Sequence, residues 1–300
     1  MKKTLIVATR GGALATAQTQ IVVSSLQKIY PEIEIRIKKI ASEGDKDRRT
    51  TLWELKSTGF FTSRLEDTLL AAEADMAVHS FQDLPTAIRK GLMIGAILDR
   101  RFPEDCLVSA SLIKSIDELP RGAKVGTSSL RRTIQLMRLK DDLQCVPIRG
   151  NVTTRLKKLE QGDFDAIVLA RAGLERLRYG GKISIVFDPT QFVPSPAQGA
   201  LAVEICADDT ETGKIVSSLD DKNVRITTTT ERLVFSALQC GCHAPAGVFA
   251  KITGASMNIY GVFSEPDGEH FIQSSVSGPL TQAGQLAEQL ADKLKPKGLS

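Results

Sequence analysis

The chain has 300 residues, of which 42% are hydrophobic and 25% are charged. Both fractions are close to the averages for globular proteins, and they exclude disordered, collagen-like and fibrous proteins. The 39 basic and 35 acidic residues leave a net charge of +4, which is too small to predict nucleic-acid binding from bulk electrostatics. At roughly 150 residues per domain, the length predicts at least two domains. Any preference for anions must therefore come from the positions of the arginines.

The sequence lacks the patterns of a membrane protein, a metal site or a common nucleotide site. No run approaches the roughly 18 apolar residues of a membrane helix, and the apolar run before Thr9 is shorter than a signal peptide requires. The three histidines are scattered, and neither a P-loop nor a GxGxxG motif is present. The odd count of five cysteines indicates unpaired thiols, so together with the lack of a signal peptide it predicts a cytoplasmic protein, and the scattered histidines predict no metal site.

The first part of the chain alternates strands and helices. Apolar periodicity predicts strands at 4–8, 33–37, 76–79 and 93–98, and helices from residue 13 and through 65–70. Such alternation predicts a mostly parallel sheet with helices on its faces. Ligands of such sheets bind beyond the carboxyl ends of the strands.

A charged segment at 99–103 is interpreted as a hinge. After it, the alternation of strands and helices starts again. Strands are predicted at 106–109, 123–125, 143–148 and 166–170, and helices at 129–139, 152–159 and 172–177. Pro194, Pro196 and Gly199 mark a second crossing. The apolar run 200–206 that follows could return to the first sheet.

Beyond residue 220 the pattern changes. A helix is predicted at 224–238, strands at 247–252, 256–263 and 271–276, and a terminal helix at 281–294. The turn residues 265–268 indicate an antiparallel meander. The sequence therefore predicts an α/β fold of two domains with a cleft between them, 1–99 with 198–217 and an inserted 100–197, followed by a smaller α+β domain, 218–300.

Hydroxyl residues and two arginines meet at the predicted start of the helix at 129–139. The segment runs Gly126, Thr127, Ser128, Ser129, Leu130, Arg131, Arg132. Hydroxyls there cap the helix, while free backbone N–H groups and guanidinium groups bind anions. Capping explains the hydroxyls but not the adjacent arginines, so the segment predicts an anion site.

Further arginines lie at or near other strand ends. The next predicted strand and helix again have arginines between them, since Arg149 and Gly150 follow the strand and Arg155 lies in the first turns of the helix. Arg176 lies beyond the strand at 166–170, and Arg10 follows the first strand. Each alone could be a solvated surface residue. Together they predict a cleft that holds several carboxylates or phosphates through paired hydrogen bonds.

Two other residue types could carry chemistry. Asp83 follows a buried strand that ends at His79 and Ser80. It could only cap the next turn, but in a cationic cleft it could also exchange a proton and stabilise a cation. Cys242, beside His243, is either an inert loop thiol or a nucleophile or attachment site, and its spacing does not decide between them.

The sequence resembles the porphobilinogen deaminase family, also called hydroxymethylbilane synthases, across nearly its whole length. The matching motifs are Ala8-Thr9-Arg10, Glu43-Gly44-Asp45, Ala77-Val78-His79-Ser80 through Asp83-Leu84-Pro85, Gly126 to Arg132, Arg149-Gly150-Asn151-Val152 with Thr154-Arg155, Ala172-Gly173-Leu174 with Arg176, Gln198-Gly199-Ala200, and Gly241-Cys242. So many ordered matches make chance resemblance very improbable.

The resemblance implies an enzyme that joins four porphobilinogen units head to tail and releases ammonia each time. It implies a dipyrromethane cofactor, assembled from the substrate and attached to Cys242 through a thioether, and it makes Asp83 the residue beside the pyrrole N–H groups. The implied cofactor-binding residues are Ser80, Asp83, Thr127, Ser128, Ser129, Arg131, Arg132 and Gly150, and the implied substrate-binding residues are Arg10, Arg149, Arg155, Arg176 and Gln198. We expect a monomer that binds neither nucleic acid nor a membrane.

The chain also departs from the family pattern. Gln82, Glu54 and Thr58 stand where the family usually has lysines, while Lys56 is shifted within its loop and could compensate. Since each charge-assisted hydrogen bond contributes on the order of 1.5 to 3 kcal/mol, reduced or altered activity is one hypothesis.

Two alternatives to the transferase follow. A divergent relative could bind pyrroles without polymerising them. A solute-binding protein would share two periplasmic-binding-protein-like α/β domains and an arginine-lined cleft, but the absence of an export signal and the presence of Cys242 on a third domain argue against it.

Overall fold

The structure is a computed structural model, and it describes residues 2–40, 62–238, 245–268 and 270–295. The chain divides into two compact units, Met1–Arg101 with Gly199–Arg225 and Phe102–Gln198 with Ile226–Ser300. Two of the boundaries, after Arg101 and after Gln198, lie in the segments that the sequence marks as crossings, and the third follows Arg225. None of the helices in the described ranges could cross a bilayer. Each unit is described by itself below.

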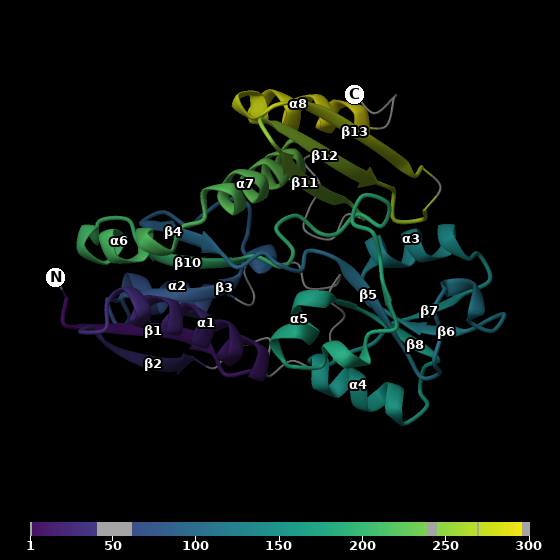
Figure 1. Ribbon diagram of the computed structural model, residues 1–300, viewed down its shortest axis with the longest axis horizontal. Helices are drawn as coiled ribbons and strands as arrows, with labels where there is room; N and C mark the ends of the chain where they lie inside the picture. The colour runs from purple at the N-terminus through teal and green to yellow at the C-terminus, as the bar shows by residue number, and fades with distance from the viewer. Residues whose placement is uncertain (1, 41–61, 239–244, 269, 296–300) are drawn as a thin grey trace. The chain divides into compact units, whose positions relative to one another are not determined.

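The first unit is built on a five-stranded sheet. Its strands are, in spatial order, β2 (Glu34–Ile40), β1 (Thr4–Arg10), β3 (Met76–Ser80), β10 (Leu201–Cys206) and β4 (Leu92–Leu98) (Figure 1). β1 runs parallel to β2 and β3, whereas β10 runs antiparallel to β3 and β4. The expected return of the chain to this sheet is confirmed. β4 therefore runs in the same direction as β1, β2 and β3, and the expected mostly parallel sheet is confirmed, with β10 as its one antiparallel strand in the described ranges.

Helices cover both faces of this sheet. α1 (Ala13–Ile29) and α6 (Thr210–Val216), a helix that the sequence analysis missed, pack on one face, where Val22 and Ile215 join Val7. α2 (Ser63–Leu70) packs on the other face, where Leu65 contacts the cluster around Ala8. Val7 and Ala8 point to opposite faces, as successive residues of a strand do.

The second unit repeats this mixed plan. Its larger sheet has the order β7 (Gln144–Val146), β6 (Lys124–Gly126), β8 (Ala166–Ala170), β5 (Asp105–Ser109), β9 (Ile185–Val186). β6 is parallel to β7 and β8, and β5 is antiparallel to β8 and β9. β7 is shorter than expected and ends at Val146, since Pro147 has no N–H group for a sheet.

Three helices follow strands of this sheet: α3 (Leu130–Leu139), α4 (Val152–Glu160) and α5 (Arg171–Arg176). Side chains cap the first two. Ser129 accepts a hydrogen bond from the backbone N–H of Arg132, and Asn151 accepts one from that of Thr154. The expected capping at the start of α3 is therefore confirmed.

The C-terminal part forms a three-stranded antiparallel meander that one helix precedes and another follows in the sequence. The elements are α7 (Lys222–Ala237), β11 (Gly247–Thr253), β12 (Ser256–Phe263), β13 (Ile272–Pro279) and α8 (Ala283–Leu294). Val234 of α7 and Leu290 of α8 pack on one face of the sheet, and Phe249 and Val262 on the other face contact Val193. The predicted α+β character is confirmed, and an independent third domain stays a prediction.

Candidate active site

In the first unit, two predicted site residues end neighbouring strands. Arg10 is the last residue of β1 and Ser80 the last of β3. The parallel register pairs Ala8 with Ala77, so both strands end at the same edge of the sheet. Ser80 is held there by Gln18 of α1, whose Nε2 donates to Oγ of Ser80 at 2.8 Å.

Asp83 follows directly in a short 3-10 helix, Phe81–Asp83. Desolvation by surrounding protein raises the pKa of its carboxyl, and the positive charge of Arg10, a hydrogen bond from Gln82 and the charge of His79 oppose the rise without cancelling it. Asp83 is nevertheless an exposed residue, so water can reach it although protein atoms surround its carboxyl. A reachable carboxyl with a raised pKa keeps its proton at a higher pH than an ordinary aspartate does, and it can still release that proton.

A buried contact between a histidine and a glutamate lies in the strands next to this segment. Nε2 of His79 is 3.0 Å from Oε2 of Glu204, and both side chains are buried. The sequence analysis did not single out this pair. The signal was present, since each residue is a charged or titratable group inside an otherwise apolar strand.

In the second unit, the three predicted hydroxyl residues stabilise the turn between β6 and α3. Oγ1 of Thr127 accepts from the N–H of Ser129 at 3.3 Å. Oγ of Ser128 donates to the carbonyl of Ile148 at 2.7 Å and accepts from its N–H at 3.0 Å. The turn is thereby tied to the segment that carries Arg149 and Gly150.

The two adjacent arginines of α3 share a carboxylate that the sequence analysis missed. Asp105 is completely buried at the start of β5 and accepts hydrogen bonds from both Arg131 and Arg132. Burial alone would raise the pKa of Asp105, but these two guanidinium groups hold it below its usual value. Gln198, also buried, donates to the same carboxylate at 3.1 Å.

Arg155 lies in a cluster of like charges. Desolvation and the positive charges of Arg132 and Arg149 lower the pKa of Arg155 to about 10. Nε of Arg155 donates to the carbonyl of Gly150 at 2.8 Å. Gly150 has φ +113°, and a Cβ there would lie 2.6 Å from Thr154, so the position requires glycine. Guanidinium groups that repel one another form a site that carboxylates would stabilise.

The remaining predicted residues are placed as follows. Arg176 is the last residue of α5 and is half-buried, and Gln82 is exposed beside Asp83. Cys242 and Lys56 lie outside the described residues, as do Glu54, Thr58 and His243.

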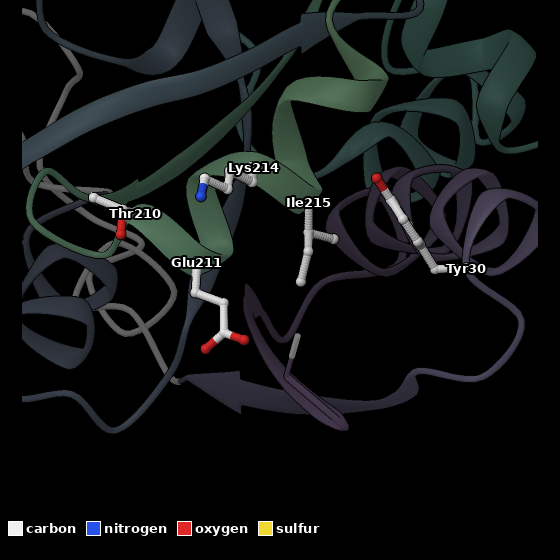
Figure 2. A pocket seen from close by; sticks show the side chains of 5 residues that line it. All are labelled: Tyr30, Thr210, Glu211, Lys214 and Ile215. Atoms are coloured by element: carbon white, nitrogen blue, oxygen red, sulfur yellow. The ribbon is translucent and has the colours of Figure 1, made fainter.

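A separate pocket of about 350 Å³ lies elsewhere on the first unit. Figure 2 shows its lining by Tyr30, which follows α1, and by four residues of α6: Thr210, Glu211, Lys214 and Ile215. Tyr30 lies beyond the C-terminal end of the 17-residue α1, whereas Arg10 precedes its N-terminal end. Since such a helix is about 25 Å long, the pocket is remote from Arg10.

Comparisons with known proteins cover nearly the whole chain. Residues 5–214 match the family model for the porphobilinogen deaminase, dipyromethane cofactor binding domain, and residues 225–296 match that for the porphobilinogen deaminase C-terminal domain. The chain belongs to the porphobilinogen deaminase family. A porphobilinogen deaminase from Carboxydothermus hydrogenoformans is 39% identical over 99% of this chain and 96% of its own length. Another, from Brevibacillus brevis, is 40% identical over 95% and 93%.

Membership in the porphobilinogen deaminase family makes the chain a transferase of tetrapyrrole biosynthesis, with hydroxymethylbilane synthase activity. Its cofactor is dipyrromethane. The residues of the second unit fit this group, because each pyrrole carries two carboxylates and Arg155 is a desolvated cation that the positive charges of Arg132 and Arg149 also affect.

Solved structures of proteins with other names align with this chain at much lower sequence identity. The methionine-binding protein MetQ aligns with a TM-score of 0.45 at 12% identity, covering 72% of this chain and 89% of MetQ. The periplasmic aliphatic sulphonate binding protein SsuA from Escherichia coli aligns with a TM-score of 0.42 at 18% identity, covering 80% and 72%. The full-length deaminase relatives favour neither the solute-binding alternative nor the divergent one.

Proposed function

We propose that Asp83 is the catalytic carboxyl in the head-to-tail condensation of four porphobilinogen units with release of ammonia. The observation that carries this assignment is a solvent-reachable carboxyl with a raised pKa, close to Arg10, just beyond the carboxyl ends of β1 and β3. Ligands of α/β sheets bind at such ends.

Each addition breaks the C–N bond of the substrate's aminomethyl group and forms a C–C bond to the terminal pyrrole of the growing chain. Asp83 in its protonated form donates a proton to the leaving amine, and its carboxylate then stabilises the positive charge that develops on the substrate pyrrole. As the C–C bond forms, the α-proton of the attacked pyrrole passes to the carboxylate of Asp83, which restores its protonated form and balances the step.

The arginines bind the carboxylates of cofactor and substrate. In the second unit the charges of Arg132 and Arg149 reach Arg155, which supports a joint carboxylate site. Arg10 and Arg176 are proposed to bind further substrate carboxylates. The other proposed ligands are Ser80, Thr127, Ser128, Ser129, Gly150, Arg131 and Gln198. Most of these already make the local hydrogen bonds described above, so we propose that they mainly shape the site.

We propose that the cofactor is attached covalently to Cys242. When bound, the dipyrromethane supplies the primer to which substrate units are added. Intact-mass measurement of the purified protein and of its Cys240→Ser and Cys242→Ser variants tests this assignment. We expect a two-pyrrole adduct on the wild type and on Cys240→Ser, and none on Cys242→Ser. An adduct that survives in Cys242→Ser would overturn it.

Porphobilinogen is the proposed substrate, and the proposed state of the protein is a cytoplasmic monomer with a separate C-terminal domain. Steady-state turnover of porphobilinogen by the purified protein tests the activity itself. Turnover in the range of its relatives would also reject the idea that Gln82, Glu54 and Thr58 impair this enzyme.

A further inference from the structure

The carboxylate of Asp105 lies among the arginines at the start of α3, although its charge is opposite to that expected in an anion site. Oδ2 of Asp105 accepts from Nη1 of Arg131 at 2.8 Å, and Oδ1 accepts from Nε and Nη2 of Arg132 at 3.0 and 2.8 Å. Nε2 of Gln198 lies 3.1 Å from Oδ1. Donors from three side chains thus converge on one completely buried carboxylate.

One consequence is that Arg131 connects α3 to the C-terminal sheet. Its Nη1 also donates to the carbonyl of Val193 at 2.7 Å. A Cβ at Gly247, the first residue of β11, would lie 2.5 Å from that carbonyl oxygen and 3.1 Å from Cδ of Arg131. The Asp105–Arg131 pair therefore lies beside the start of β11.

The second consequence concerns Arg132, whose guanidinium is held at two nitrogens by the same Oδ1 atom. The side chain of Arg132 is only 12% exposed. Its positive charge, like that of Arg149, contributes to the lowered pKa of Arg155. Asp105 therefore holds Arg132 in a place where it contributes to the arginine cluster.

We propose that Asp105 is a positioning residue for carboxylate binding, which acts by orienting Arg132 toward Arg155 and by anchoring Arg131. This inference rests on the proposed function of these arginines. By Coulomb's law alone, a negative charge near an anion site weakens anion binding. Orientation and bare charge therefore predict changes of opposite sign when Asp105 is neutralised.

The test is Asp105→Asn in the full-length protein, with KM and kcat for porphobilinogen measured alongside the fraction of chains that carry the covalent adduct. We expect KM to rise roughly tenfold or more, the adduct fraction to fall, and kcat of the loaded fraction to change less than twofold, since a misplaced guanidinium loses a charge-assisted bond. A KM at or below the wild-type value, with the protein folded, would overturn the proposal.

Asp105→Glu keeps the charge but moves the carboxylate by one methylene, so it serves if Asp105→Asn does not fold. We expect a raised KM here as well, and an unchanged KM contradicts the positioning role. In Arg132→Lys, which keeps the charge but loses the paired donors, adding Asp105→Asn should raise KM less than twofold further. Asp165→Asn is the matched control, because Asp165 binds the N–H of Lys124 away from the arginines, and its KM should stay at the wild-type value.

The variants Arg149→Gln and Arg155→Gln distinguish a failure of the proposed arginine site from a failure of the positioning role of Asp105. If both leave KM unchanged, the arginine site of the proposed function fails. If both raise KM while the Asp105 variants do not, only the positioning role of Asp105 fails.

Discussion

His79 and Glu204 form a diagonal pair between two antiparallel strands, with Nε2 and Oε2 3.0 Å apart. In the register of β3 and β10, His79 lies opposite Ala202 and Glu204 opposite Ala77. Both side chains lie on the same face as Ala77, which α2 covers. The pair is therefore buried directly before the short segment that carries Asp83.

We expect Glu204→Gln to lower the free energy of unfolding by about 3 kcal/mol, because removal of one partner leaves the other polar group buried without its counter-charge. Urea unfolding monitored by circular dichroism measures this change. The double variant His79→Leu with Glu204→Leu should lose less than the single one, since two apolar groups can pack together. A single variant as stable as the wild type would contradict this account of the pair.

Asp83→Asn should lower kcat by about 100-fold or more, because the amide keeps the size of the side chain but cannot ionise. The unfolding midpoint should change little, since the side chain is exposed. Steady-state kinetics and urea unfolding of the same preparation check both statements. Asp208→Asn, at another exposed aspartate of the first unit, is the control. Wild-type turnover by Asp83→Asn would remove Asp83 from the mechanism.

Because Asp83 acts in its protonated form, its titration sets the alkaline limb of the pH profile of kcat/KM, and Gln82→Lys should shift that limb to lower pH by about one unit. A cation beside Asp83 favours its carboxylate and so lowers the pKa that desolvation has raised. Gln82→Leu removes the hydrogen bond that now lowers this pKa, so its limb should move to higher pH. Shifts in the same direction for the two variants would exclude Asp83 as the titrating group.

Arg155→Gln should raise KM roughly tenfold while the free energy of unfolding rises by on the order of 1 kcal/mol. Arg155 has a folded-state pKa lowered to about 10, so the folded protein carries its charge at a cost at every pH below that value. Removal of the charge relieves this cost but loses a carboxylate ligand. Kinetics and urea unfolding at neutral pH measure both effects, and a simultaneous loss of stability and affinity would indicate a merely structural role.

Much of the fold could be predicted because its signals are local. Apolar periodicity and turn residues predicted β8 with the bounds that the structure shows, and the meander at β11 to β13. α6 was missed because its seven residues include Thr210, Thr212 and Gly213, which are poor helix formers. The direction of β10 could not be predicted, since periodicity shows that a strand is buried but not which way it runs beside its neighbours.

For the candidate site, the sequence by itself determined the residue types: arginines and hydroxyls at strand ends and helix starts, and Asp83 after a buried strand. Only the tertiary structure decided what their side chains contact. Arg131 and Gln198 looked like free ligands, yet both donate to Asp105, which is 26 residues from the first and 93 from the second. Such contacts depend on how β5 pairs within its sheet, because that pairing decides which donors lie near the carboxylate of Asp105. A buried carboxylate binds those donors, since a buried charge without a partner costs a large free energy.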